Sequence, residues 1–316
     1  MEKNYVIGID LGGTKISGVL SNLNGKIMYK HTIPTNAYEG EQAVLDRIIG
    51  VIDKVILDSN ANLEEIKAIG IGSPGPLNAK TGVIIETSNL PFKNFQLIQP
   101  IKERFNIPTF LDNDANVATL GEHMFGAGKG TENMIYVTVS TGVGGGAIIN
   151  GKIFRGNTNN ALEVGHTTID VDGPTCNCGN KGCIEAYSSG TAIARLANEA
   201  VQKGESTSLN NYEKITAKEV FVEAEKGDSV AKAVLDLSLN YLGVFIANLI
   251  TTFDPEMIVI GGGVSMAGKI VFDKINEVVK VRCLKQMAES CKIVPAGLGT
   301  DAGIVGAAAL GISESK

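Results

Sequence analysis

The chain has 316 residues, of which 44% are hydrophobic and 20% charged, and its formal net charge is -6 at pH 7. This composition indicates a globular protein long enough for one large domain or two smaller ones, and its acidic balance argues against the basic face that a nucleic-acid-binding surface needs. No uninterrupted run of about 18 apolar residues is present, and the N-terminal sequence MEKNYVIGIDLGG lacks the pattern of a secretory signal. We therefore expect a cytoplasmic protein, in which disulfides are rare.

The first predicted elements form a β-hairpin with a glycine turn. The sequence VIGIDLGGTKISGVLSNLNGKIMYKHTI indicates strand, glycine turn, strand, a tight turn at Asn24-Gly25, and strand. The glycine turn matches neither a Walker loop nor a Rossmann fingerprint, because both of those open a helix. A glycine turn between strands instead exposes backbone N–H groups that can bind phosphate oxygens. Asp10 ends the first strand and is a suitable carboxylate for hydrated Mg²⁺.

An amphipathic helix around residues 44–56 and a buried strand in IKAIGIGSPGPL come next. The sequence PTFLDNDANVATLGEHMFG then predicts a strand, an acidic tip and a helix. Asp114 in that tip is expected at the strand end, pointing into a cleft, and is the candidate catalytic base. Asp112 is the better candidate for a structural carboxylate. The tip also has the composition of a plain helix N-cap, since Asp and Asn favour that position. Both interpretations of the tip stay open at this point.

A second hairpin repeats the organisation of the first. The sequence MIYVTVSTGVGGGAIINGKIFRG again gives strand, glycine turn, strand, a tight turn at Asn150-Gly151, and strand. Two hairpins with a glycine turn at the same place predict two phosphate-binding turns. We call residues 12–15 the first glycine turn and residues 140–144 the second glycine turn.

The sequence GHTTIDVDGPTCNCGNKGC, here called the cysteine loop, contains three of the five cysteines. In a reducing compartment, clustered thiolates are more often metal ligands than disulfides. The loop supplies a closed tetrahedral set that fits structural Zn²⁺, with no position left for a bound water; its members are His166, Cys176, Cys178 and Cys183. The alternative is four unrelated side chains. Outside the loop, Cys283 and Cys291 are expected to be buried thiols, and His31 and His123 structural or surface residues.

The C-terminal part of the sequence adds a long helix over residues 230–253, stopped by Asp254-Pro255. The strand MIVIGGG follows, and its glycines lead to a helix that is expected to begin near Ser265. No low-complexity linker separates the halves. We expect a small N-terminal α/β domain of residues 1–116 plus 300–316 and a larger α/β domain of residues 117–299, which carries the cysteine loop.

Six motifs in this order resemble the ROK family of sugar kinases and repressors, within the actin-like ATPase superfamily: IGIDLGGTK, LDNDAN, VSTGVGGG, EVGH, CNCGNKGCIE and VIGGGVS. The resemblance covers essentially the whole chain, and the histidine-cysteine segment is its most specific part. Among kinase members the similarity is greatest to bacterial glucokinases. The resemblance implies a two-domain α/β fold of the actin-like, ribonuclease H-like ATPase type, with a cleft between the domains and a zinc-binding loop.

The resemblance implies an ATP-dependent hexose kinase that phosphorylates the 6-hydroxyl of glucose. Asp114 is then the general base, because a sugar hydroxyl is a poor nucleophile until its proton is removed. N-acetylmannosamine and fructose remain open as substrates. Polyphosphate remains open as a donor, although the glycines at 261–263 favour a nucleotide. A sugar-sensing transcriptional regulator is disfavoured, because family repressors carry a DNA-binding helix-turn-helix before the first glycine turn and here a strand begins within a few residues of Met1.

The family pattern also assigns site residues. Sugar contacts fall to Gly75, Asn89, Asn113, Asp114, Glu163, His166 and Glu185. Asp10 is placed near Mg²⁺, and the phosphates and adenosine of ATP near Gly12, Gly13, Thr14, Lys15, Thr141, Gly142, Gly144, Gly262 and Gly263. Zinc would hold one ring nitrogen of His166 and leave the other for a hydroxyl. Family members are often dimers or tetramers, so we expect a homodimer or homotetramer whose partners are a hexose and ATP, without nucleic acid or membrane.

Overall fold

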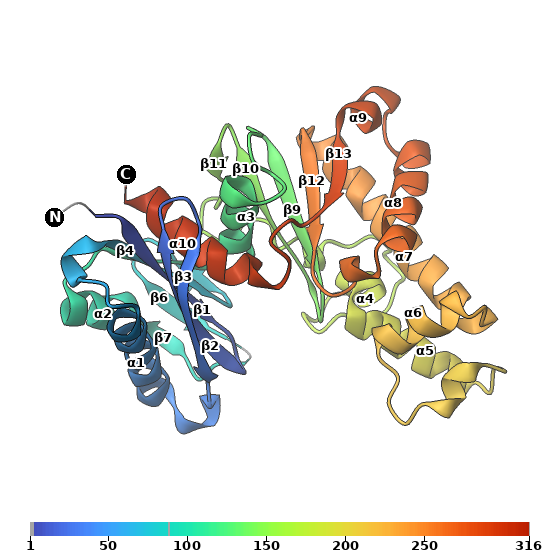
Figure 1. Ribbon diagram of the computed structural model, residues 1–316. Coiled ribbons are helices and arrows are strands. Elements are labelled where there is room, and N and C mark those ends of the chain that lie inside the picture. The colour runs from blue at the N-terminus through green and yellow to red at the C-terminus, as the bar shows by residue number, and fades with distance from the viewer. Residues whose placement is uncertain (1–2, 88, 316) are drawn as a thin grey trace. The chain divides into compact units, whose positions relative to one another are not determined.

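The computed structural model describes residues 3–87 and 89–315 (Figure 1). Packing divides the chain into two compact units, described separately below. Unit 1 comprises residues 1–132, 146–162 and 297–316, and unit 2 comprises residues 133–145 and 163–296. These ranges place residues 117–132 in unit 1, whereas the sequence pattern placed them in the second domain.

The main sheet of unit 1 has five strands in the order β3-β2-β1-β4-β8. They are β1 (Tyr5–Leu11), β2 (Lys15–Asn22), β3 (Ile27–Pro34), β4 (Ile66–Ser73) and β8 (Thr109–Asn113). The first three strands are antiparallel and β4 and β8 run parallel to β1, which confirms the predicted strand-turn-strand start. A small antiparallel sheet adds β5 (Leu77–Asn78), β6 (Val83–Glu86) and β7 (Lys93–Gln96).

The helices of unit 1 are α1 (Glu41–Ser59), α2 (Ile98–Phe105), α3 (Asp114–Phe125) and α10 (Ala302–Glu314). Helix α1 buries one stripe of aliphatic side chains at helical spacing, as the sequence predicted. Helix α10 lies directly on the sheet: a Cβ at Gly70 would be 2.0 Å from the carbonyl oxygen of Ala307. Helix α3 approaches α10 as closely, because a Cβ at Gly306 would be 2.0 Å from the carbonyl oxygen of Val117. These glycine contacts are the physical reason that α3 belongs to unit 1.

The second five-stranded sheet has the order β11-β10-β9-β12-β13. Its strands are β9 (Met134–Val139), β10 (Val143–Ile149), β11 (Lys152–Ile153), β12 (Met257–Gly261) and β13 (Lys292–Pro295). The division between the units falls within β10. Strands β9, β10 and β11 and the turn at Asn150-Gly151 confirm the predicted second hairpin.

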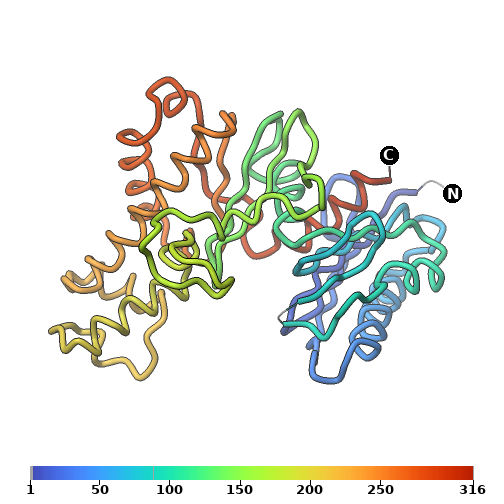
Figure 2. The backbone as a smooth tube through the Cα atoms, turned by 180° about the vertical axis from the view of Figure 1, so that it is seen from behind, coloured from blue at the N-terminus to red at the C-terminus, as the bar shows by residue number. Residues whose placement is uncertain are grey.

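The helices of unit 2 are α4 (Glu185–Ser188), α5 (Gly190–Gln202), α6 (Ala217–Glu225), α7 (Ser229–Phe253), α8 (Lys269–Arg282) and α9 (Lys285–Ser290), and their chain path is visible from behind in Figure 2. Short 3₁₀ turns across both units are η1 (Ala37–Glu39), η2 (Leu63–Glu65), η3 (Val164–His166), η4 (Ser208–Asn211), η5 (Ser265–Ala267) and η6 (Gly299–Asp301). The helix expected from Ser265 therefore begins as the turn η5. Gly268, with φ of 71°, separates it from α8.

Helix α7 ends where the sequence predicted, with Asp254 in the left-handed conformation and its N–H donating to Ile250. Although charged and polar residues interrupt its apolar sequence, α7 has the length and mean hydropathy, 1.7, of a membrane-crossing helix. However, 61% of that stretch is buried inside the structure. Gly243 of α7 faces Val278 of α8, and a Cβ there would be 2.5 Å from Cβ of Val278. These contacts are typical of the central helix of a globular core.

The cysteines and histidines outside the cysteine loop occupy structural or partly exposed positions, and one of them, Cys291, is less buried than the sequence predicted. Cys283 is buried, whereas Cys291 is only half-buried because it leads from α9 into the outermost strand β13. The Nε2 atom of His123, near the end of α3, lies 2.8 Å from the carbonyl oxygen of Thr131. His31 lies half-buried on β3, which is an edge strand of the main sheet of unit 1.

Candidate active site and metal centre

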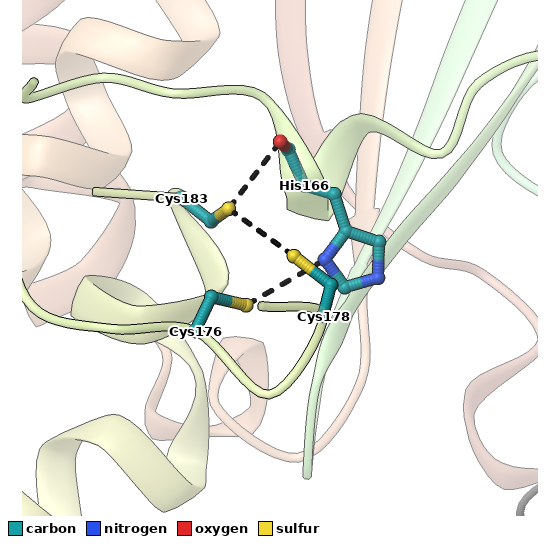
Figure 3. A group of neighbouring side chains, drawn as sticks. All are labelled: His166, Cys176, Cys178 and Cys183. Carbon is teal, nitrogen blue, oxygen red and sulfur yellow. Dashed lines mark hydrogen bonds between the residues drawn. The ribbon is translucent and has the colours of Figure 1, made fainter. Parts of the chain in front are cut away.

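The four ligand residues predicted for zinc lie together in unit 2 (Figure 3). Their ligand atoms are all within 4.8 Å of one another. The sulfurs of Cys178 and Cys183 are 3.7 Å apart, and the sulfur of Cys176 is 3.7 Å from Nδ1 of His166. A tetrahedral zinc ion with bonds of about 2.0–2.3 Å requires donor-to-donor distances of about 3.5–3.8 Å. The residues therefore fit the ion that their chemistry implies.

Two glycines fold the cysteine loop into this shape, as expected. Gly179 and Gly182 have φ values of 92° and 68°, in the region that favours glycine. A Cβ at Gly182 would lie 1.5 Å from the carbonyl oxygen of Asp170, so no other residue fits there. The N–H of Cys176 donates to the carbonyl of Asn180 at 2.8 Å and closes the turn that carries the first two thiols.

The thiols differ in how readily they ionise without a metal. Burial raises the pKa of Cys183 to about 12 and also raises the pKa of Cys176. The backbone N–H of Asn180 lowers the pKa of the exposed Cys178 thiol. Metal binding therefore has to release protons from the two buried thiols, which makes metal affinity fall as the pH falls.

His166 ends the turn η3, and its ring directs Nδ1 toward the sulfurs, while Nε2 points away from them (Figure 3). Glu163 immediately precedes η3, and its exposed carboxylate has no hydrogen-bond or ion-pair partner among residues 3–87 and 89–315. Gly165 between them packs on β10, where a Cβ would be 2.0 Å from the carbonyl oxygen of Val143. The motif EVGH thus fixes a free imidazole nitrogen and a carboxylate beside β10.

Glu185 is the first residue of α4 and joins the cysteine loop to the second glycine turn. Its Oε2 accepts a hydrogen bond from the N–H of Val143 at 3.0 Å, and its Oε1 lies 3.9 Å from the sulfur of Cys176. A Cβ at Gly142 would be 2.4 Å from Oε2. The sequence motif assigned Glu185 only to the sugar, and no sequence signal indicated its bond to the turn.

The second glycine turn is anchored to the start of α5. Gly190 donates its N–H to the carbonyl of Ser140 at 2.7 Å, and the hydroxyl of Thr191 donates to the carbonyl of Thr141 at 2.6 Å. Thr141 itself is exposed, and Gly144 lies half-buried on β10. These bonds hold the exposed Thr141 in a fixed place at the end of the sheet.

The glycines after β12 pack on the same end of the sheet. Gly262 has a φ of 85°, and a Cβ there would be 2.4 Å from the carbonyl oxygen of Val139. The N–H of Val264 donates to the same carbonyl at 3.0 Å. Gly263 lies between them and lines a pocket that also includes Thr141.

That pocket lies within unit 2 and has a volume of about 1070 Å³. Residues of the second glycine turn, α5, α6, the turn η5 and α8 line it, among them Ala194, Ile215, Phe221, Val222, Met266 and Ile270. The volume and the mostly apolar wall suit a ligand of nucleoside size or larger. Sequence reasoning found only Thr141 and Gly263 of this lining. Most of the apolar residues belong to the helices α5, α6 and α8, which carry no motif.

The first glycine turn, in unit 1, is closed by its own backbone. Gly12 donates its N–H to the carbonyl of Lys15 at 3.0 Å, and the buried Thr35 binds both the carbonyl of Gly12 and the carbonyl of Thr14. The N–H of Gly12 is therefore committed to the turn. A Cβ at Gly13 would be 2.9 Å from the carbonyl oxygen of Asn89, so a predicted phosphate residue and a predicted sugar residue are in contact.

Asp10 is the next-to-last residue of β1 and is half-buried. Burial raises the pKa of its carboxyl, and Lys15 and Lys30 oppose the shift. Gly303, in the first turn of α10, leaves room for this carboxylate, since a Cβ there would be 3.3 Å from its oxygens. A carboxylate with this environment gains from a nearby cation.

The acidic tip is the N-cap of α3, which is one of the two roles left open by the sequence. Asn113 is the N-cap of α3 and accepts the N–H of Ala115 at 2.8 Å, while Asp114 follows as an exposed residue. Asp112 is fully buried and accepts from Nε of Arg155 at 2.6 Å, which confirms its structural role. Gly75 adjoins the tip, because a Cβ there would be 3.2 Å from Nδ2 of Asn113.

The predicted site residues thus form groups within each unit. Unit 1 pairs Gly13 with Asn89 and Gly75 with Asn113, and unit 2 brings Glu185 beside Gly142 and the four ligands. Each five-stranded sheet has a glycine turn between antiparallel strands, and helices pack on both sheets. Together with the four-ligand loop, these features define the class as a two-unit fold of the actin-like ATPase type.

The chain belongs to the ROK family, whose model matches residues 6–314. It is 39% identical to a glucokinase of Halalkalibacterium halodurans over 311 residues, covering 97% of this chain and 94% of that protein. It is 33% identical to a xylose repressor of Caldicellulosiruptor bescii, covering 98% of this chain and 78% of the repressor.

Solved structures agree with the family assignment. A ROK hexokinase from Thermus thermophilus is similar with a TM-score of 0.86 and 34% identity, over 98% of each chain. A ROK glucokinase from Streptomyces griseus in complex with glucose and AMPPNP is similar with a TM-score of 0.79 and 31% identity, over 96% of this chain and 98% of that one.

Proposed function

We propose that the chain is an ATP-dependent sugar kinase that transfers the γ-phosphoryl group to the 6-hydroxyl of glucose. The observation that carries this proposal lies within unit 2. There a four-ligand loop presents His166 and Glu185 beside a glycine turn, and this turn borders a pocket of about 1070 Å³. Similarity to glucokinases, one of them solved with glucose and AMPPNP, supports the same combination of ligands.

Asp114 is the proposed general base, because its carboxylate is exposed at the start of α3. It takes the proton of the 6-hydroxyl as the oxygen attacks the γ-phosphorus, a contribution of about 10²–10⁴-fold in rate. Asn113 beside it uses Oδ1 to cap α3, which leaves its amide nitrogen to donate to a sugar hydroxyl. Gly75 and Asn89 complete the proposed sugar contacts of unit 1, and Glu163, His166 and Glu185 those of unit 2.

The two glycine turns are the proposed phosphate contacts. In the first turn these fall to Gly13, Thr14 and Lys15, because the N–H of Gly12 is used within the turn. In the second turn they fall to Thr141, Gly142 and Gly144. Asp10 would hold Mg²⁺, which when bound neutralises charge on the β- and γ-phosphates. Adenosine is assigned to the pocket beside Gly262 and Gly263.

His166, Cys176, Cys178 and Cys183 would hold Zn²⁺ in a closed site. Since protein ligands would fill all four positions, bound zinc would activate no water. It would stiffen the loop, which carries His166 and is flanked by Glu163 and Glu185. Nδ1 of His166 is the ligand atom, and Nε2 is then the proposed donor or acceptor for a sugar hydroxyl.

A kinase assay tests the proposal and its alternatives. ADP release is measured with ATP and a panel of hexoses and N-acetyl hexosamines, and sugar-phosphate formation is measured with polyphosphate as donor. We expect the largest kcat/KM with glucose and ATP, rather than with N-acetylmannosamine or fructose. The similarity to xylose repressors makes a sugar-binding regulator the second candidate. Sugar binding without phosphoryl transfer to any sugar would establish that candidate instead. We also propose a cytoplasmic homodimer or homotetramer, to be checked by light scattering of the purified protein.

A further inference from the structure

The contact between Glu185 and Val143 joins two sites that the proposed function treats separately, the sugar pocket and the phosphate turn. Oε2 of Glu185 accepts the N–H of Val143 at 3.0 Å, directly after the turn residue Gly142. Glu185 also follows the ligand Cys183 by two positions and opens α4. The folded cysteine loop therefore fixes the point from which this carboxylate reaches the turn.

Both backbone groups of Val143 face the segment that carries the metal ligands. Its N–H binds Glu185, and its carbonyl oxygen faces Gly165, where a Cβ would be only 2.0 Å away. Val143 is 7% exposed, so water replaces neither contact readily. On the other side of the carboxylate, the missing side chain of Gly142 leaves room for it, since a Cβ there would be 2.4 Å from Oε2.

From this geometry we infer that Glu185 is a positioning residue for the nucleotide as well as a sugar ligand. Oε2 holds the second glycine turn in its phosphate-binding shape, and Oε1 remains for the sugar hydroxyl. The inference rests on the proposed function, because it takes the turn to bind phosphates. Because one carboxylate contacts both the sugar and the phosphate-binding turn, sugar binding and nucleotide binding are coupled inside unit 2. Tight nucleotide binding then also requires a folded cysteine loop, since this loop holds Glu185 in place.

The test measures nucleotide binding in the absence of any sugar, so that lost sugar contacts have no effect on the result. The zinc-loaded full chain is titrated calorimetrically with AMPPNP and Mg²⁺. Glu185→Ala removes the acceptor and leaves the N–H of Val143 unpaired, which weakens AMPPNP binding about 5- to 10-fold. Glu185→Gln keeps a neutral acceptor of the same length, and its Kd stays within about twofold of wild type. Zinc content is measured in every variant and stays the same.

Glu163→Ala is the matched control, because Glu163 flanks the same loop and is a proposed sugar ligand without a contact to the turn. Its AMPPNP Kd is unchanged while its glucose Kd rises. Gly142→Ala tests the contact from the turn side, since the added Cβ displaces Oε2 of an intact Glu185. Because Gly142 is itself a proposed phosphate contact, the substitution is made in wild type and in Glu185→Ala. At unchanged zinc content it weakens AMPPNP binding in the wild-type background and has little further effect in Glu185→Ala, as expected if it acts through the carboxylate.

The outcomes separate the inference from the proposed function. If wild type binds AMPPNP and both Glu185→Ala and Gly142→Ala bind it equally well, Glu185 is a sugar ligand only and the inference is wrong. Equal weakening in Glu185→Ala and Glu163→Ala also overturns it, because the effect then belongs to the acidic surroundings of the loop. If wild type itself binds no AMPPNP, the proposed function fails and the inference fails with it.

Discussion

The buried pair between Asp112 and Arg155 gives the sharpest test of how the acidic tip is held. Asp112 is 0% exposed, and its Oδ1 accepts from the N–H of Asn113 at 2.8 Å and from Nδ2 of Asn116 at 2.9 Å. Its Oδ2 accepts from Nε of Arg155 at 2.6 Å. The carboxylate therefore fixes the backbone of the residue before Asp114.

Asp112→Asn keeps one oxygen but turns an N–H₂ group toward a guanidinium donor. Removing one partner of a buried ion pair costs about 3–5 kcal/mol. The lower end, about 3 kcal/mol, applies here, because Arg155 keeps its bond to Glu314 at 2.7 Å. The free energy of unfolding is measured by urea denaturation, and kcat is measured on the remaining folded protein. We expect kcat to fall as well, because the tip loses its anchor.

The surface pair of Asp53 and Arg104 is the matched control. These side chains are 46% and 56% exposed and lie 3.4 Å apart, so Asp53→Asn should cost less than about 1 kcal/mol. A double-mutant cycle with Arg155→Met isolates the buried pair. A cost below 1 kcal/mol for Asp112→Asn, or strictly additive effects in the cycle, would refute the assignment of the ion pair as the anchor of the tip.

Three further predictions concern catalysis, metal and pH. Asp114→Asn should lower kcat about 10²–10⁴-fold while calorimetry still detects sugar binding; near-normal turnover would remove Asp114 as the base. Elemental analysis should find about one zinc per chain, and Cys183→Ser should lower both zinc content and thermal midpoint; full stability in metal-free protein would contradict a structural ion. Burial raises the pKa of Asp10, so this carboxyl keeps its proton to higher pH in the folded state than in the unfolded state. Its contribution to the free energy of unfolding therefore falls as the pH rises above the ordinary pKa of 3.8. Asp10→Asn should therefore raise the thermal midpoint at pH 7 and abolish Mg²⁺-dependent turnover, whereas an unchanged midpoint from pH 3 to pH 7 in both proteins would contradict the linkage.

Local chemistry explains what could be predicted. The hairpins at Asn24-Gly25 and Asn150-Gly151, the end of α7 at Asp254 and the four metal ligands all follow from short-range rules. The N-cap in the acidic tip was also predictable, because Asn favours that position; Asn113 caps α3, and Asp114 beside it is exposed. The predicted start of α8 near Ser265 was early by a few residues. Gly268 takes a positive φ that separates η5 from α8, and a pattern of apolar residues does not reveal this break.

Packing between distant segments decided the rest. The sequence alone determined which residue types recur at which spacing, and this is enough for strands, turns, caps and a ligand set that closes within a loop. Only the tertiary structure decided that α10 lies on β1 and β4 through Gly8 and Gly70, and that Glu185 reaches the N–H of Val143 from 42 positions away. The physical reason is that a close approach depends on which surfaces the folded sheets and helices bring together, and neither a missing Cβ nor a carboxylate specifies its distant neighbour.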